Sequence, residues 1–300
     1  MRDDVVEFVR TGEFSRLENL ATTYRDSQAR TSSGLWKLTL FYSGIKSYLD
    51  MRRQDEWLWN AKEKNIRKWV STYPSSATAH VAMAKYFIAR GWGYRGGGFA
   101  HTVEEPNWKP FHDNVQKARD YLEKNKAVAS SDPHWYELMG IIAYAQSWPE
   151  TDFTNLMDEG LARHPRFYQL YFTAIDYYAP KWGGSAKSIE LFARQAISRT
   201  QPVEGFGMYA RVYWYASQSQ YDERLFTDSL VNWNDMKIGI DNVVKSYPDA
   251  WNINNFAKFA CLSKDKVKAA ELIRRIDGPL MQDVWGAQDK FQRCKEWSLR

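Results

Sequence analysis

The residues best suited to covalent chemistry are the two cysteines, Cys261 and Cys294. Cys261 ends one expected helix, and Cys294 lies on the last expected helix, in a stripe with Ala287, Phe291 and Ser298. At most two helices separate the cysteines, so stacked helices would bring their Cα atoms within disulfide range. The alternative is two buried thiols that behave as small hydrophobic side chains in a reducing compartment. Both remain open at this point, and the lack of a Cys-x-x-Cys motif argues against redox catalysis.

A glycine-rich segment over residues 90–110 is the second candidate site, because it is the longest stretch expected to be irregular. Glycine N–H groups can bind an anion beside an arginine, and exposed aromatic rings can stack on a ligand. The segment matches no nucleotide-binding loop, since it opens no helix with Gly-Lys-Ser/Thr and follows no expected strand. The structural alternative is a turn with close helix packing and rings folded onto the core. The candidate ligand or partner contacts are Arg90, Trp92, Tyr94, Arg95 and Trp108.

A smaller candidate rim lies at residues 180–184, Pro-Lys-Trp-Gly-Gly, and adds Trp182 to the candidate contacts. Its structural alternative is a helix C-terminal cap, in which glycine adopts the left-handed conformation. Ser185 follows directly, and we expect it to cap a helix over residues 186–199.

Patterns for metal binding and catalysis are weak. The chain has no His-Glu-x-x-His, no two histidines at i and i+4, and no Gly-x-Ser-x-Gly. Asp132-Pro-His134 is interpreted as a turn, where polar side chains are ordinary. We therefore expect no metal, no cofactor and no enzymatic activity; a hydrolase centred on the glycine-rich segment is the least favoured alternative. A loose polar group near that segment consists of His101, Glu104, Glu105, His112 and Asp113.

The elements that must position these residues are helices separated by proline-marked turns. Pro74, Pro133, Pro165 and Pro248 each follow one apolar-periodic stretch and precede another, and proline fits the first turn of a helix but not its interior. Pro133 and Pro165 are 32 residues apart, close to the tetratricopeptide period of about 34. The fold class predicted is all-α, a stack of helical hairpins in a tetratricopeptide-like αα-superhelix. No linker or low-complexity tract is present, which favours one continuous domain over residues 1–300.

Composition excludes several classes of protein. The net charge is only +5, and Lys and Arg are mixed with Asp and Glu, so no nucleic-acid partner is expected. No run of about 20 apolar residues exists, so no membrane span is expected. The first residues, Met-Arg-Asp-Asp-Val-Val, lack the apolar region of a signal peptide; the protein is cytoplasmic, or a signal has been removed. The chain has 14 Trp, 18 Tyr and 15 Phe, which we interpret mainly as core.

Several landmarks in order resemble a bacterial family, the domain of unknown function 4034. They are Leu17-Glu18, Gly34-Leu-Trp-Lys-Leu, Phe41-Tyr-Ser-Gly44, Arg90-Gly91 with the glycine-rich segment ending in Thr102-Val103, Pro180-Lys-Trp-Gly-Gly184, Tyr247-Pro-Asp249, Asn254-Asn-Phe-Ala-Lys-Phe-Ala-Cys261, Lys264-Asp265 and Trp285…Cys294…Trp297. The resemblance spans nearly the whole chain and implies an all-helical, tetratricopeptide-like fold in bacteria, with no activity attached. Trp92 and the insertion-like Arg95-Gly-Gly make the glycine-rich segment longer than the resemblance leads us to expect.

The resemblance also places both cysteines at marked positions, which favours a bridge and hence a periplasmic or secreted protein; without a bridge the cytoplasm is expected. The function we expect is a non-catalytic module that binds a protein or peptide, such as an immunity protein against a secreted toxin or an adaptor of an envelope or secretion machine. The alternative is binding of a carbohydrate or peptidoglycan fragment through the aromatic rings of residues 92–108. Neither the partner nor the oligomeric state follows from the sequence.

Overall fold

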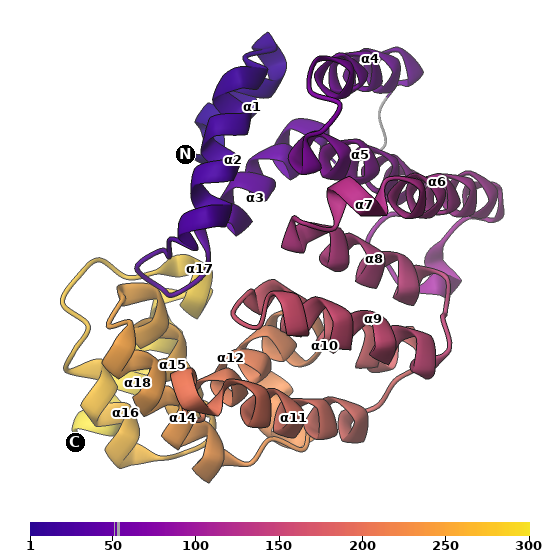
Figure 1. Cartoon of the computed structure of the whole chain (residues 1–300). Coiled ribbons are helices and arrows are strands. Elements are labelled where there is room, and N and C mark those ends of the chain that lie inside the picture. Colours follow the sequence, from indigo (N-terminus) through magenta and orange to yellow (C-terminus); the bar gives the residue numbers. More distant parts are fainter. Residues whose placement is uncertain (51, 53–54) are drawn as a thin grey trace. The chain divides into compact units, whose positions relative to one another are not determined.

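The computed structural model describes residues 1–50, 52 and 55–300, and within that part of the chain the regular elements are helices, with no strand (Figure 1). The predicted all-α class is therefore confirmed, and hairpin stacking is consistent with it. By internal contacts the chain forms two compact units. Unit 1 comprises residues 1–29 and 36–177, and unit 2 comprises residues 30–35 and 178–300. The two units are defined by contacts within the folded chain, and contacts alone do not show whether each unit folds independently. One continuous domain over residues 1–300 therefore stays a prediction.

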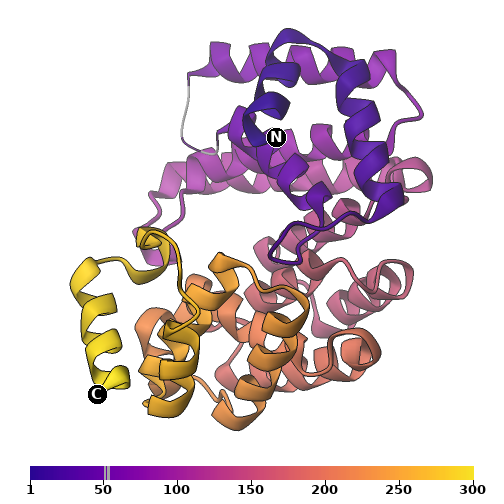
Figure 2. The same cartoon turned by 90° about the vertical axis from the view of Figure 1, so that its left-hand side faces the viewer.

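Unit 1 is built from helices that pack largely in chain order. The pairs α4–α5, α5–α6, α6–α8 and α8–α9 are each in contact, and α5 and α6 run side by side (Figures 1 and 2). Its elements are α1 (Arg2–Thr11), α2 (Phe14–Ser27), α3 (Lys37–Leu49), α4 (Glu56–Thr72), α5 (Ala77–Arg95), the 3₁₀ turn η1 (Ala100–Thr102), α6 (Glu105–Lys124), α7 (Lys126–Ala129), α8 (Pro133–Ala145), α9 (Glu150–Arg163) and α10 (Tyr168–Tyr178).

Unit 2 continues the same pattern, with contacts α11–α12, α12–α14, α14–α15, α15–α16 and α16–α18. Its elements are η2 (Pro180–Trp182), α11 (Ala186–Glu204), α12 (Gly207–Ala216), the π-helical turn η3 (Ser217–Tyr221), η4 (Asp222–Arg224), α13 (Leu225–Asp228), α14 (Trp233–Ser246), α15 (Ala250–Leu262), α16 (Lys266–Ile273), α17 (Gln282–Trp285) and α18 (Gln288–Leu299). The C-terminal helix α18, yellow in Figure 2, lies against α16 and α15.

The proline-marked turns are where the sequence predicts them. Pro133 occupies the first turn of α8, and the Asp132 side chain caps that helix by accepting a hydrogen bond from the His134 N–H. Pro74 and Pro248 lie in the turns before α5 and α15. Pro133 supplies a helical φ and needs no hydrogen-bonded N–H at the start of α8, whereas Pro74 and Pro248 lie outside the helices and end the preceding ones.

The glycine-rich segment is shorter than predicted. Helix α5 continues through Gly91 and Gly93 to Arg95, and α6 already begins at Glu105, so the prediction of an irregular stretch over 90–110 was wrong at both ends. A Cβ on Gly91 would lie 3.3 Å from the Phe111 carbonyl oxygen of α6, and one on Gly93 would lie 3.2 Å from the Trp59 ring. Close packing against these neighbours offsets the roughly 1 kcal/mol that each glycine costs a helix.

Unit 1 contains a buried polar network centred on Asp132, which is fully buried. Its Oδ2 accepts hydrogen bonds from Arg25 and from the Tyr42 hydroxyl, each at 2.7 Å, while its Oδ1 accepts from the His134 N–H at 2.9 Å. Asp132 does lie in the turn before α8, as predicted, but Asp132 and His134 are buried and are not ordinary turn residues. Buried carboxylates are stable only when paired in this way, so the network joins α2, α3 and α8 through one side chain.

His134 extends this network to two more buried charges. Its ring stacks on Tyr42 at 3.9 Å, its Nε2 lies 2.8 Å from the Lys85 Nζ, and its Nδ1 contacts Glu137 Oε2. Because an ammonium only donates, Nε2 accepts and a neutral ring carries its proton on Nδ1. Burial lowers the pKa of His134, and it lowers the pKa of Lys85 to about 8. Burial alone would raise the pKa of Glu137, but His134 and Lys85 hold it below its usual value.

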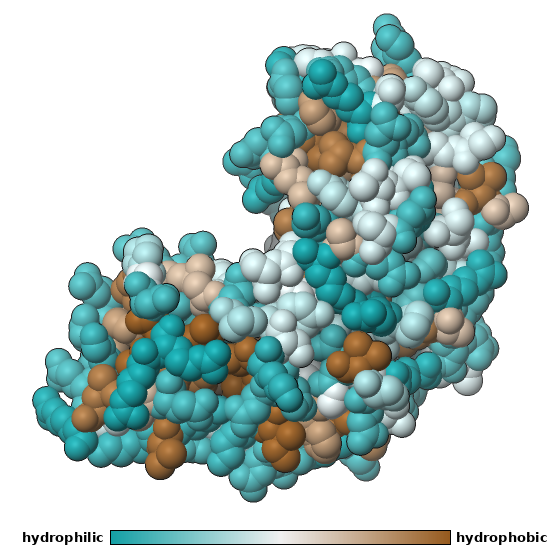
Figure 3. Space-filling model, turned by 60° about the vertical axis from the view of Figure 1, so that its left-hand side comes forward, coloured by the Kyte–Doolittle hydropathy of each residue, from teal (hydrophilic) through white to brown (hydrophobic). Residues whose placement is uncertain are grey.

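Among the described residues, no helix is both long enough and apolar enough to cross a lipid bilayer. On the face drawn in Figure 3, hydrophobic residues form small patches separated by hydrophilic ones. Small separated patches are ordinary on a folded surface, so that face offers no large apolar docking area.

Candidate functional site

The residues predicted from the glycine-rich segment lie at the end of α5 and the start of α6, in unit 1. Arg90 and Tyr94 both reach Glu56, with the Tyr94 hydroxyl donating to Oε1 at 2.6 Å and Arg90 forming an ion pair at 2.5 Å. Arg90 also donates to the Tyr86 hydroxyl at 3.3 Å. Arg90 and Tyr94 therefore connect α5 to α4, and in this structure their role is structural.

The other three residues, Trp92, Arg95 and Trp108, all pack around the Phe111 ring. Trp92 meets Phe111 edge-on with ring centroids 4.9 Å apart, and it meets Tyr144 at 6.1 Å. The guanidinium of Arg95 lies 5.7 Å from the Trp108 ring centroid and donates to the carbonyls of Gly96 and Gly98. The structure therefore brings Trp92, Arg95 and Trp108 together, with much of their surface already in contact with the protein.

Trp182 belongs to the other unit, in η2. The turn ends at Gly183, whose φ of 93° is left-handed, as the capping alternative predicts. A Cβ on Gly184 would lie 2.0 Å from the Tyr178 carbonyl oxygen, so the chain passes too closely there for a side chain. Ser185 caps α11 by accepting a hydrogen bond from the Ser188 N–H at 3.1 Å, which confirms that prediction.

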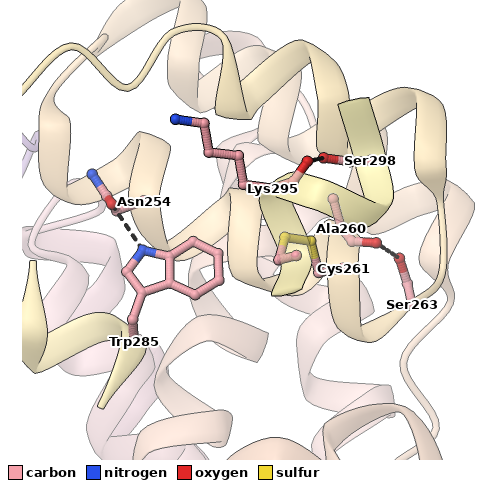
Figure 4. The surroundings of a disulfide bond; sticks show 8 residues. Asn254, Ala260, Cys261, Ser263, Trp285, Lys295 and Ser298 are labelled. Carbon is pink, nitrogen blue, oxygen red and sulfur yellow. Dashed lines mark hydrogen bonds between the residues drawn. A yellow bond between two sulfur atoms is a disulfide. The ribbon is translucent and has the colours of Figure 1, made fainter. Parts of the chain in front are cut away.

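The two cysteines form a disulfide in unit 2 that joins α15 to α18, with Cα atoms 5.9 Å apart. Helix α15 ends one residue after Cys261, and Cys294 lies in the middle of α18. Figure 4 shows the bond between the two helices, with Trp285 of α17 nearby and its indole N–H donating to Asn254 at 2.9 Å. The sequence left open a disulfide or two buried thiols, and the structure contains the disulfide.

One cavity lies beside this disulfide, and a second shares four lining residues with it, Glu223, Lys258, Trp285 and Lys290. We call the two together the Lys258 cleft. The first, of about 350 Å³, is also lined by Cys261, Leu262, Arg293, Cys294 and Trp297. The second, of about 360 Å³, is also lined by Ser217, Gln218, Asp222, Asn255, Phe259, Asp283, Val284 and Gly286.

The shared centre of the cleft is one carboxylate between two ammonium groups. Glu223 Oε1 lies 2.7 Å from the Lys290 Nζ and 3.8 Å from the Lys258 Nζ. Lys258 also donates to the Val284 carbonyl at 3.0 Å. The hydrogen bond from Lys290 lowers the pKa of Glu223, and burial lowers the pKa of the half-buried Lys258. The site thus favours a negatively charged group where Glu223 now lies.

Glu223 is presented by irregular backbone. The helical path of α12 passes into the π-helical turn η3, and Asp222, the first residue of η4, then adopts a φ of 49°. A left-handed conformation at a non-glycine residue carries strain, and π-helical turns are frequent at functional sites. This segment therefore distinguishes the Lys258 cleft from the regular hairpins around it.

A larger cavity of about 650 Å³ lies at the other end of α15, between its first turn and residues 275–283. It shares Asp283 with the second cavity of the cleft. Its apolar lining includes Trp251, Ile253, Leu280 and Met281. Ligand-binding cavities commonly measure about 300–1,000 Å³, so this cavity and the two of the cleft are each large enough to accept side chains of a partner.

Sequence reasoning did not identify Lys258, Lys290 or Glu223. A signal for the two lysines was present, since each precedes a cysteine by about one helical turn. A disulfide between Cys261 and Cys294 therefore constrains both lysines to the neighbourhood of one bond. Glu223 had no such signal, because it lies in a turn far from either cysteine in the sequence.

Among the described residues, no group of three or more His, Cys, Asp or Glu side chains is arranged to hold a metal ion. The chain matches no protein-family model, no curated protein and no solved structure. The resemblance to the domain of unknown function 4034 family thus stays a prediction, and the fold is known from the structure alone.

Proposed function

We propose that the protein is a non-catalytic protein–protein interaction module, and that a peptide segment of its partner binds in the Lys258 cleft. The observation that carries this proposal is the cleft itself, which combines an ion-paired centre with aromatic and aliphatic walls from α15, α17 and α18. Helical hairpin stacks bind peptides with such surfaces. An immunity protein against a secreted toxin and an adaptor of an envelope or secretion machine are its two concrete forms.

The walls of the cleft supply the apolar contacts that an interface needs. Trp285 is buried, whereas Trp297 is 39% exposed and lines the first cavity beside the disulfide. Tryptophan and arginine are enriched among residues that contribute most to binding, and both Trp297 and Arg293 line this cavity. A partner side chain that enters here would bury the exposed face of Trp297.

The alternative, carbohydrate binding through residues 92–108, has less support. Sugar stacking requires an open ring face, and both Trp92 and Trp108 already contact Phe111 edge-on. Phe99, 56% exposed, is the ring of that segment with the most open surface, and it stacks on His101 at 5.9 Å.

Site-specific photo-crosslinking in the native host tests the proposal. A benzoylphenylalanine replaces Arg293 at the cleft or, as a control, Leu191, which is 56% exposed on α11 of the same unit. We expect one discrete polypeptide adduct from position 293 and none from 191. The recovered partner should bind the purified protein, lose affinity for Trp297→Ala, and keep its intact mass after incubation. Equal adducts at both positions, or a partner that is chemically altered, would overturn the proposal.

A further inference from the structure

We infer that the Lys258 cleft accepts a carboxylate from an acidic segment of the partner, and that Glu223 occupies this position in the unbound protein. This inference rests on the proposed function and names the chemistry of the bound segment. Two ammonium groups from different helices, Lys258 of α15 and Lys290 of α18, converge on one carboxylate oxygen of Glu223. Such convergence is the geometry by which a protein binds a carboxylate.

The charge around the first cavity favours an anionic occupant. Lys258, Lys290 and Arg293 line it, against Glu223 as its one carboxylate. Arg293 is also paired with Asp289, one turn earlier on α18, at 2.9 Å. The acidic residues Asp222 and Asp283 line the second cavity instead. The incoming carboxylate is therefore expected on the disulfide side of the cleft.

The first cavity also indicates which type of residue should neighbour that carboxylate in the partner segment. Its cationic centre adjoins an apolar wall made of Leu262, Trp297 and the disulfide. A segment in which an acidic residue neighbours a large apolar residue would satisfy both parts. A purely acidic segment would leave the exposed face of Trp297 in water, and a purely apolar one would leave the ammonium groups without a new partner.

Glu223 is suited to displacement. Its side chain is 45% exposed, and solvent-exposed ion pairs contribute little to stability. It lies in the short turn η4 directly after Asp222 with its left-handed φ, so no long helix holds it in place. An entering carboxylate can take over both ammonium contacts while Glu223 turns toward solvent.

The test uses the full-length oxidised protein and a fluorescein-labelled probe peptide, Glu-Glu-Trp-Glu-Glu-Leu, with a Gln-for-Glu peptide as its uncharged counterpart. Fluorescence polarisation should give about fivefold tighter binding for Glu223→Gln than for wild type, because the internal competitor is neutralised. Lys258→Met and Lys290→Met should each weaken binding about tenfold or more. Lys295→Met removes an exposed charge from the same helix α18 without touching the cleft, so it should change binding less than twofold.

Each other outcome decides against the inference. Equal or weaker binding to Glu223→Gln, equal losses for Lys290→Met and Lys295→Met, or equal affinity for the uncharged peptide would each overturn it, as would no binding up to about 1 mM. Circular dichroism and thermal unfolding confirm that each variant is folded. If the adduct at position 293 persists in Lys258→Met and Lys290→Met, the interaction module stands and only the acidic specificity fails. If no adduct forms at 293, the proposed function itself fails.

Discussion

The carbonyl oxygen of Ser33 accepts a hydrogen bond from the Arg211 guanidinium at 3.1 Å, across 178 residues of sequence. Asn252 donates to the same oxygen at 3.2 Å, so residues 30–35 are bound into unit 2 by its helices α12 and α15. Burial lowers the pKa of Arg211 to about 10, and its guanidinium also lies 5.3 Å from the Tyr247 ring centroid. A short segment between α2 and α3 thus belongs by its contacts to a unit formed mostly by the C-terminal half.

Gly34→Ala tests how much this segment contributes to unit 2. Gly34 has a φ of 94°, and an added Cβ would lie 2.5 Å from the Arg211 guanidinium and 2.9 Å from the Tyr247 ring. Backbone strain and steric overlap together should lower the free energy of unfolding by about 2 kcal/mol or more, measured by urea denaturation. Gly278→Ala is the control, because its Cβ would meet no atom within 4 Å. Similar midpoints for the two variants would show that residues 30–35 are not held tightly.

The hairpin architecture was predictable because its signals are local. A proline at the start of a helix and apolar residues every three or four positions act within a few residues, so Pro133 and Ser185 marked helix starts correctly. The disulfide could be named as one of two alternatives, since both cysteines lie on helices close in sequence. Whether the two cysteines form a disulfide or stay as separate thiols depends on how those helices pack, and the sequence pattern does not show that packing.

The errors have the same origin. The low helix propensity of Gly91 and Gly93 predicts that α5 ends before them. Packing of these glycines against α6 and α4 outweighs that propensity, and α5 continues to Arg95. Nothing in the sequence indicates that Asp132 and His134 are buried. Their partners Arg25, Tyr42 and Lys85 are far away in the sequence, so no local pattern shows that these side chains meet. Residues joined only by tertiary contacts give no periodic signal, and Glu223 in the Lys258 cleft belongs to the same class.

Asp132→Ala should destabilise unit 1 strongly. The change removes the N-cap of α8 and leaves the Arg25 guanidinium and the Tyr42 hydroxyl without their shared acceptor. Loss of one partner from such a buried pair costs about 3–5 kcal/mol. Asp132→Asn keeps the shape and the cap, so it should lose less. Asp120→Ala removes an exposed carboxylate from the same unit and should cost less than about 0.5 kcal/mol in thermal or urea unfolding; a comparable loss there would contradict the proposed importance of the network.

Lys85 should make unit 1 more stable as pH rises above about 8. Its pKa is lowered to about 8 by burial, whereas an unfolded lysine titrates near 10.4. Between these values the unfolded chain binds more protons than the folded one, so stability increases with pH, by about 2 kcal/mol between pH 8 and 10. The charged groups that face Lys85 are Glu137 and, more distantly, Lys46, with His134 as its hydrogen-bond partner.

The difference between wild type and Lys85→Met isolates this contribution, because other groups that titrate at high pH are common to both. Urea unfolding at several pH values should give a stability difference that shifts in favour of wild type as the pH rises through this range. A difference independent of pH would mean that Lys85 keeps an ordinary pKa when folded.

Reduction of the disulfide should weaken both unit 2 and the Lys258 cleft. Cys261 and Cys294 are 33 residues apart, and closing a loop of that length stabilises a protein by about 3–4 kcal/mol in the chain-entropy model. Urea unfolding with and without reductant measures this change, and the double variant Cys261→Ala, Cys294→Ala should not respond to reductant. Because Lys258 and Lys290 belong to the two helices that the bond joins, reduction should also lower affinity for the acidic probe peptide. Unchanged peptide affinity in the reduced protein would show that packing of α18 against α16 is enough to keep the two lysines together.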